Sequence, residues 1–387
     1  MFSSRTEQST LKIAARDLAH VKPPNRVCFS RSREKFPNVI NPNKIGPYQL
    51  RETLGRGSFS IVKLAIDENT GKRYACKIVP KKRLIEQNME AQFEHEVRIL
   101  QKLKHPHIAT LEDILKDTLN YYLILELCST GSLYDYIVNH KRISEQDAKY
   151  LFKQIAKTLE YLHTNNVTHR DIKPENILID KNLTVKFIDF GFSEIQPNNS
   201  LLETQCGSFS YVSPQCLKGD KYDGFENDIW SAGVVLYTMV NGQLPWSGSN
   251  IKQLRNQIIH ADYYLSAHFS EELQDLIKGM LQPDTEKRYR IDTIVNHPWL
   301  ENVGDPALSH DADLTILQAI GEDAVDKFFS ANLNYSYQQN HSEVLSECQA
   351  LLIMTNRRRF SIPRKSTSCR LERAMIKQAR SYSFDPS

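Results

Sequence analysis

Long apolar runs are missing from this 387-residue chain, and its seven cysteines follow no recurrent spacing. Because a membrane-spanning helix needs about 20 consecutive apolar residues, the sequence offers no segment of that kind. Its first residues also lack the apolar core of a signal peptide. An odd, scattered set of cysteines argues against a disulfide framework or a zinc site and favours a reducing compartment. We therefore expect an intracellular protein, in the cytoplasm or the nucleus.

The net charge is also small, at +3, but it is unevenly distributed. Segments 1–47 and 357–387 each carry nine Lys or Arg residues, against three and two acidic residues, so the chain between them is acidic. Basic ends on an acidic body can fold back, bind acidic lipid or nucleic acid, or remain solvated. The composition favours solvated, disordered tails and argues against a nucleic-acid partner. The 40% hydrophobic and 25% charged residues are typical of a globular protein with a proper core.

The most informative stretch reads H-R-D-I-K-P-E-N at residues 169–176, followed by D-F-G at 189–191. It combines a base, a cation and two oxygen ligands. Phosphoryl transfer requires these groups, because the protein's part in that reaction is to position the reactants and neutralise charge. Asp171 would accept the proton of the attacking hydroxyl, and Lys173 would steady the transferred group. Asn176 and Asp189 present hard oxygen atoms that suit Mg²⁺.

With these two motifs in this order, the chain resembles the eukaryotic protein kinases. The resemblance covers about two thirds of the chain, and we draw the catalytic domain over residues 48–300. It implies a bilobal α+β fold, with a small β-rich lobe carrying one helix and a large, mainly helical lobe. It also implies ATP and Mg²⁺ as cofactors. The flanking segments would be a basic leader (1–47), a helical extension (301–356) and a basic tail (357–387).

Upstream motifs supply the expected nucleotide contacts. Residues 54–62 read as a hairpin turn, with glycines where backbone amides must approach phosphate oxygens. Lys77, in the strand-like stretch 74–78, resembles the kinase lysine that binds the α and β phosphates. An apolar strand and hinge at 121–128 would offer the backbone of Glu126 and Cys128 to adenine. The complete set expected at ATP is Leu54, Gly55, Arg56, Gly57, Ser58, Phe59, Ser60, Val62, Ala75, Lys77, Leu125, Glu126, Cys128 and Leu178.

Apolar residues recur at helical spacing between Phe93 and Leu103, so residues 90–104 are predicted to be the helix of the small lobe. Glu96 on this helix resembles the family glutamate that pairs with the strand lysine. The alternative is a solvated surface carboxylate. A second apolar helix, over residues 148–163, should lead into the catalytic loop.

Two positions depart from the family pattern. Ser60 replaces the third glycine of the phosphate loop, and Gln215 replaces a glutamate that the family pairs with an arginine, here Arg288. A glutamine can keep one hydrogen bond but loses the charge and the bidentate fork, so we expect a looser activation segment or lower stability. These departures motivate the alternative of a catalytically weak pseudokinase-type scaffold that binds nucleotide.

Several residues indicate the substrate class and its regulation. Lys173, Phe192 and the loop at 206–211 resemble those of serine/threonine kinases of the calmodulin-dependent and AMP-activated group, which implies protein substrates with Ser or Thr. Thr204 resembles the activating threonine of that group. We predict that an upstream kinase phosphorylates it and that the phosphate pairs with Arg170. An ordinary loop threonine is the alternative.

The last part of the chain is harder to interpret. Apolar spacing over residues 311–355 predicts about three short amphipathic helices, which loosely resemble a ubiquitin-associated module. They could instead form a docking or autoinhibitory segment. Arg358, three residues before Ser361, and Pro363, two after it, give the pattern of a phosphorylation site that a phosphoserine-reading adaptor could bind. Segment 370–380 is basic and partly apolar, a weaker candidate for calmodulin or a membrane surface.

Overall fold

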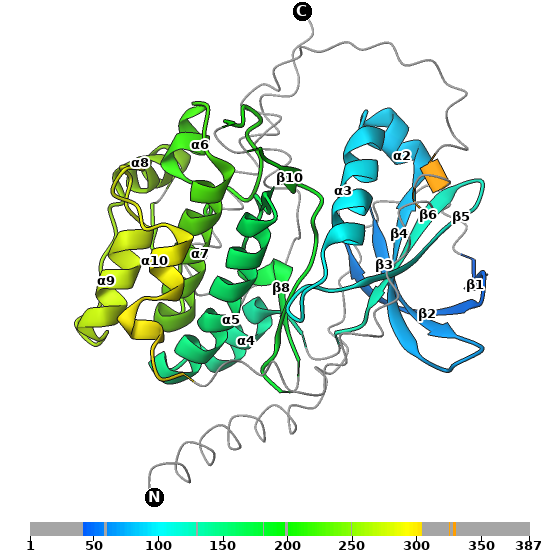
Figure 1. Ribbon diagram of the computed structural model, residues 1–387, viewed down its shortest axis with the longest axis horizontal. Helices are drawn as coiled ribbons and strands as arrows, with labels where there is room; N and C mark the ends of the chain where they lie inside the picture. Colours follow the sequence, from blue (N-terminus) through cyan, green and yellow to red (C-terminus); the bar gives the residue numbers. More distant parts are fainter. Residues whose placement is uncertain are drawn as a thin grey trace, which may run out of the picture.

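The computed structural model has a small sheet-based lobe and a larger helical lobe, drawn in blue to cyan and in green to yellow in Figure 1. This is the bilobal α+β architecture that the sequence predicts. The structure describes residues 42–57, 60–128, 131–180, 182–197, 200–248 and 250–303, together with Val325, Phe328 and Phe329.

The small lobe is built on an antiparallel sheet with the strand order β1-β2-β3-β4-β6-β5. Along β4 the side chains of Tyr74, Cys76 and Ile78 are buried, whereas Ala75 and Lys77 between them are partly exposed. This period of two places Ala75 and Lys77 on one face of the sheet, which leaves them available to a ligand. The strands are β1 (Lys44–Ile45), β2 (Tyr48–Arg56), β3 (Ile61–Asp67), β4 (Arg73–Pro80), β5 (Leu111–Lys116) and β6 (Asn120–Glu126).

Two helices, α2 (Lys81–Glu86) and α3 (Glu90–Lys102), complete the small lobe beside the sheet (Figure 1). The apolar face of α3 is buried in the main core, as its spacing predicted. The helix ends two residues before the predicted boundary at 104, because Leu103 has an extended backbone. Pro106 lies three residues further on, and helices usually end at or before the residue that precedes a proline.

The large lobe is centred on α7 (Gly224–Asn241), which is buried on nearly every side. Helix α5 (Glu145–Thr164) confirms the helix predicted over 148–163; it begins earlier because Ser144 caps it by accepting the Asp147 amide. The other helices are α4 (Leu133–His140), α6 (Pro214–Lys218), α8 (Ile251–His260), α9 (Glu271–Met280), α10 (Ile291–Val295) and two 3₁₀ turns, Pro174–Asn176 and Pro298–Leu300. Short strands β7 (Val167–Thr168), β8 (Ile177–Ile179), β9 (Val185–Phe187) and β10 (Glu194–Ile195) frame the catalytic loop.

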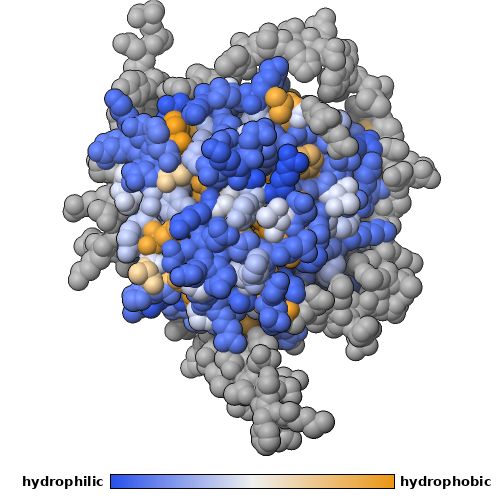
Figure 2. Space-filling view, turned by 60° about the vertical axis from the view of Figure 1, so that its left-hand side comes forward, coloured by the Kyte–Doolittle hydropathy of each residue, from blue (hydrophilic) through white to orange (hydrophobic). Residues whose placement is uncertain are grey.

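The surface of the molecule is predominantly polar on the face that Figure 2 shows, where hydrophobic residues are scattered among hydrophilic ones. Single exposed apolar residues of this kind are normal for a globular domain. Within the described residues, no helix combines the length and the apolarity needed to cross a bilayer.

A short piece of the chain beyond residue 303 packs against the small lobe, drawn in orange beside β6 and α2 in Figure 1. Val325 is fully buried. The ring of Phe329 lies 6.2 Å from that of Phe93 on α3, and Phe328 lies 5.6 Å from Tyr121 on β6. The rest of segment 304–387 lies outside the described residues, so the three predicted helices stay a prediction.

Candidate active site

The catalytic loop runs from β7 to β8 and is held by α7. Asp228, fully buried on α7, accepts hydrogen bonds from the backbone amides of His169 (2.7 Å) and Arg170 (2.8 Å). Arg170 has a positive φ of 61°, a conformation that an L residue keeps only where its surroundings impose it. Asp228 therefore supports the backbone of the loop that carries Asp171.

Three side chains converge on the carboxylate of Asp171, which is only 2% exposed. Lys173 donates to it at 2.6 Å, Ser208 at 2.8 Å and Asn176 at 2.9 Å. Lys173 also donates to the hydroxyl of Ser208 at 2.7 Å, so Asp171, Lys173 and Ser208 form a closed triangle. A carboxylate fixed in this way is oriented to accept a proton from one direction.

Ser208 reaches the catalytic loop because Gly207 passes directly against it. Gly207 has a φ of +97°, and a Cβ atom on it would lie 2.5 Å from the carbonyl oxygen of Arg170. Only glycine combines this backbone conformation with this approach. The loop at 206–211 is thereby locked onto the residues that surround Asp171.

Lys77 on β4 joins the small lobe to the catalytic residues. Its Nζ lies 2.5 Å from Glu96 on α3 and 3.6 Å from Asp189. Glu96 is 7% exposed, so the solvated-carboxylate alternative does not describe it. Gln92, one turn earlier on α3, donates to the carbonyl of Gly191 at 2.5 Å. The strand lysine, the helix and the D-F-G motif are thus assembled around one point.

Asn176 and Asp189 fit a magnesium ion by their chemistry. Asn176 donates through Nδ2 to Asp171, which leaves its amide oxygen as the ligand atom. The carboxylate of Asp189 is 29% exposed. In the described part of the chain, no group of three or more His, Cys, Asp or Glu could hold a metal ion. The ion would therefore rely on nucleotide phosphates for further oxygen ligands, as Mg²⁺ commonly does.

The phosphate loop is the hairpin between β2 and β3, as predicted. Gly57 donates its amide to the carbonyl of Ser60 at 2.8 Å, which closes the turn. The tip residues Ser58 and Phe59 lie outside the described residues. The ends of the two strands carry the neighbouring members of the expected set, Leu54, Gly55, Arg56 and Val62.

Apolar side chains line the expected adenine site with partial exposure. Ala75 lies opposite Leu125 in the β4–β6 ladder, and Leu178 on β8 pairs with Ser132 from across the hinge. The side chains of Val62, Ala75, Leu125 and Leu178 are neither buried nor fully exposed, which fits the walls of an open cleft.

The hinge follows β6. The amide of Glu126 donates to the carbonyl of Thr110 at 2.9 Å, and its carboxylate pairs with Lys186 at 2.8 Å. The backbone carbonyl of Glu126 and the backbone of Cys128 are the hinge groups that could form hydrogen bonds with adenine. Burial raises the pKa of the Cys128 thiol to about 12, so this group is neutral at pH 7.

Four buried side chains, from α3, β5, the catalytic loop and the D-F-G motif, lie behind the site. His169 and Phe190 have ring centroids 4.9 Å apart, and both are fully buried. Leu100 and Leu111 are 7% and 3% exposed. Burial lowers the pKa of His169, so its ring is neutral and behaves as a core side chain.

Gln215 makes the single contact to Arg288 that the sequence argument expected, at 2.9 Å. It also makes one that was not expected, because its Nε2 donates to the carbonyl of Pro283 at 2.7 Å. The Arg288 guanidinium makes further bonds to the carbonyls of Gln282 (2.8 Å) and Glu226 (3.2 Å). Burial lowers the pKa of Arg288 to about 10, which still leaves it protonated at pH 7.

Two of the residues proposed for regulation, Thr204 and Arg170, are linked through Tyr222. Thr204 is exposed, and its carbonyl accepts a hydrogen bond from Tyr222 at 2.9 Å. Arg170 pairs with Glu194 at 3.3 Å, a partner that the sequence argument missed. The feature of the sequence that could have indicated this partner is a carboxylate five residues after Asp189. Ser361 lies outside the described residues.

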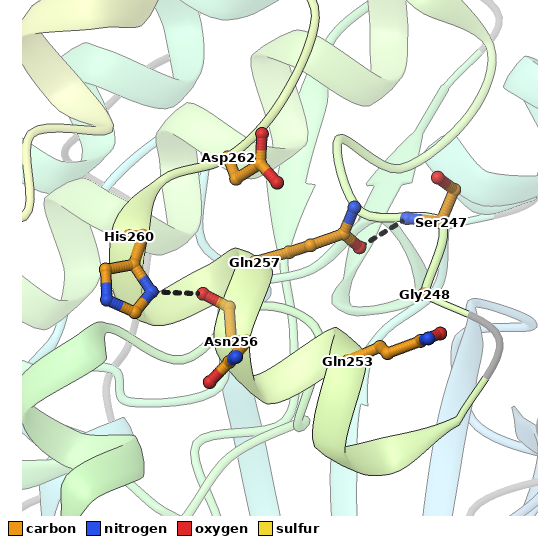
Figure 3. Close-up of a pocket in the computed structure, with 7 residues that line it drawn as sticks. All are labelled: Ser247, Gly248, Gln253, Asn256, Gln257, His260 and Asp262. Atoms are coloured by element: carbon orange, nitrogen blue, oxygen red, sulfur yellow. Dashed lines mark hydrogen bonds between the residues drawn. The ribbon is translucent and has the colours of Figure 1, made fainter.

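A separate hollow lies on α8 in the large lobe, with a volume of about 560 Å³ (Figure 3). All of the residues that line it except Gly248 have polar side chains. The side chain of Gln257 accepts the Ser247 amide at 3.0 Å across it. None of the catalytic residues lines this hollow, so it is separate from the site around Asp171. The residues that line it are Ser247, Gly248, Gln253, Asn256, Gln257, His260 and Asp262.

A sheet-based lobe and a helical lobe thus bring a lysine–glutamate pair, an oriented aspartate and two oxygen ligands to one place. This arrangement defines an enzyme that transfers phosphoryl groups from a nucleotide. Residues 48–300 match the family model described as the protein kinase domain. The chain belongs to the protein kinase family, which implies ATP as the phosphoryl donor and proteins as substrates.

Proposed function

We propose that this protein is a serine/threonine protein kinase that transfers the γ-phosphoryl group of Mg·ATP to protein Ser and Thr hydroxyls. The triangle of Asp171, Lys173 and Ser208 carries the proposal. Its hydrogen bonds hold the loop at 206–211, which would bind the acceptor residue, close to the catalytic base Asp171. A short Ser or Thr side chain suits this spacing, whereas a tyrosine ring would need the loop to stand farther away.

Each group has one role in the proposed reaction. Asp171 accepts the hydroxyl proton, and Lys173 stabilises negative charge on the group in transfer. Lys77, held by Glu96, binds the α and β phosphates. Magnesium, held by Asn176 and Asp189, supplies neutralisation of the phosphate charge.

The structure also bears on which peptides the kinase would accept. Ser132 stands where arginine-directed relatives often have an acidic residue. Its hydroxyl accepts the Asp135 amide at 3.1 Å, and Asp135 accepts the Ser132 amide and hydroxyl in return, a capping box at the start of α4. The Asp135 carboxylate is thus engaged in the cap. We propose that an arginine before the target residue is not strictly required.

Group membership, activation, partners and location complete the proposal. The kinase would belong with the calmodulin-dependent and AMP-activated group, act in the cytoplasm or nucleus, and be activated by an upstream kinase at Thr204. The exposure of Thr204 supports its access to that kinase. A phosphoserine-reading adaptor at Ser361, and more weakly calmodulin at 370–380, are the further proposed partners.

The test is ³²P transfer from Mg·ATP to matched peptide libraries whose acceptor is Ser, Thr or Tyr. Asp171→Asn serves as the inactive control. We expect transfer to Ser and Thr that is lost in the control. Transfer to Tyr alone would contradict the serine/threonine assignment, and equal background in both proteins would favour the pseudokinase-type scaffold.

A further inference from the structure

Arg170 is a buried cation whose charge must be balanced. Its side chain is 9% exposed, and its Nε donates to the carbonyl of Phe192 at 2.5 Å. Among the described residues, its ion pair is with Glu194, at 3.3 Å. A buried charge left without its partner is strongly destabilising. The carboxylate of Glu194 therefore has a defined electrostatic function beside the catalytic loop.

Two other groups near this guanidinium carry no charge. Tyr222 and Cys206 lie against Arg170, and burial raises the pKa of both the phenol and the thiol. Both are therefore neutral at pH 7 and supply dipoles only. Arg170 contributes to holding the pKa of Glu194 below its ordinary value, after the larger effect of His95, so the carboxylate is ionised.

Glu194 also touches helix α3. Its Oε1 lies 3.2 Å from Nε2 of His95, which is adjacent to Glu96 on that helix. In the backbone, Glu194 on β10 pairs with Thr168 on β7, the strand that leads into the catalytic loop. A carboxylate of the activation segment therefore contacts both the catalytic loop and the helix that holds Lys77.

We propose that Glu194 is a positioning residue that acts as a built-in anion for Arg170, assembling the catalytic loop and α3 without a phosphate on Thr204. The inference rests on the kinase activity proposed above and is independent of the acceptor residue. The unphosphorylated enzyme then has basal activity. A phosphate on Thr204 then acts on a catalytic loop and an α3 that are already assembled, and it raises activity above this basal level.

The experiment uses the full chain with Thr204→Ala, produced with a phosphatase and checked by mass for the absence of phosphate. Glu194→Gln removes the charge at constant shape, and Glu194→Asp restores it. Glu203→Gln is the matched control, because Glu203 lies in the same segment but pairs with the exposed Lys221. The measurements are kcat and KM for ATP, and hydrogen–deuterium exchange over residues 90–102.

We expect Glu194→Gln to lower kcat by about tenfold or more, with KM for ATP changed less than about threefold, because the loss is one of positioning. Exchange in α3 should become faster. Glu194→Asp should recover most of kcat, and Glu203→Gln should match the parent in both measurements.

The proposal is overturned if Glu194→Gln keeps the parental kcat, or if α3 exchange is unchanged. It is also overturned if the Thr204→Ala parent is inactive while phosphorylated wild type transfers phosphate. If neither the Thr204→Ala parent nor phosphorylated wild type transfers phosphate, the proposed kinase activity is wrong. The exchange measurement alone then decides whether Glu194 couples the catalytic loop to α3.

Discussion

Gln215→Glu would restore the residue that the family pattern has at this position, yet we expect it to bring no gain in stability. Gln215 accepts from Arg288 at 2.9 Å and donates to Pro283 at 2.7 Å. A carboxylate would strengthen the first bond, because a bond between two charged groups is stronger than one with a neutral acceptor. It would also face the Pro283 carbonyl with an acceptor and abolish the second bond.

The two effects are of similar size. Arg288 stays protonated, since its lowered pKa of about 10 lies well above 7, so the charged pair would gain about 1–2 kcal/mol. Losing the donor to Pro283 costs about 1–3 kcal/mol, and desolvating the new carboxylate adds to that cost. The free energy of unfolding should therefore rise by no more than about 1 kcal/mol, or about 4 °C in Tm for a domain of this size.

The assay is thermal unfolding of the full chain, with Gln215→Met as the contrasting variant. Methionine keeps similar volume but removes both hydrogen bonds, so we expect a loss of about 2 kcal/mol, or about 4–8 °C in Tm. A rise of more than about 4 °C for Gln215→Glu would refute the reasoning. So would a methionine variant that melts with the wild type, because the two bonds would then contribute nothing.

Three further substitutions test other contacts. Glu96→Gln should lower kcat on the order of 100-fold in a peptide-phosphorylation assay, because Lys77 loses its charged partner; Glu94→Gln, on the same helix but paired with Arg98, should not. Burial lowers the pKa of His105 to about 4, below its ordinary 6.5, so the unfolded chain binds more protons and stability falls as the pH falls from about 6.5 towards 4. His105→Asn should flatten the dependence of Tm on pH in that window, and an unchanged slope would contradict the assignment. Phe329→Ala should cost about 3 kcal/mol, or about 6–12 °C in Tm, because the ring packs on Phe93, and an unchanged Tm would contradict this packing.

Much of the site could be predicted because its catalytic residues lie in short, local sequence motifs. The residues at 169–176 and 189–191 must follow a fixed order to place a base, a cation and oxygen ligands together, so their spacing alone indicates the reaction class. Glu96 could be chosen on α3 because its spacing to the turn at residues 105–108 matches that of the family glutamate. Even the Gln215 contact to Arg288 could be foreseen, since it replaces one side chain in a known pair.

Contacts that depend on long-range packing could not be predicted. The position of Glu194 opposite Arg170 depends on the β10–β7 pairing, and two-residue strands carry no periodic signal. The packing of Phe328 and Phe329 on the small lobe joins segments more than 200 residues apart. The bond from Gln215 to Pro283 needed the side-chain orientation, which the sequence does not contain.

The described contacts converge on α3, and this convergence has a mechanical consequence. Gln92, His95 and Glu96 share one face of the helix by their spacing, and they contact Gly191, Glu194 and Lys77. Phe93, on the apolar side of the helix, packs against Phe329. Because all of these contacts are made by one helix, losing any one of them should shift α3 relative to Lys77. Glu194→Gln and Phe329→Ala should therefore lower kcat non-additively, although the two side chains lie on different sides of α3.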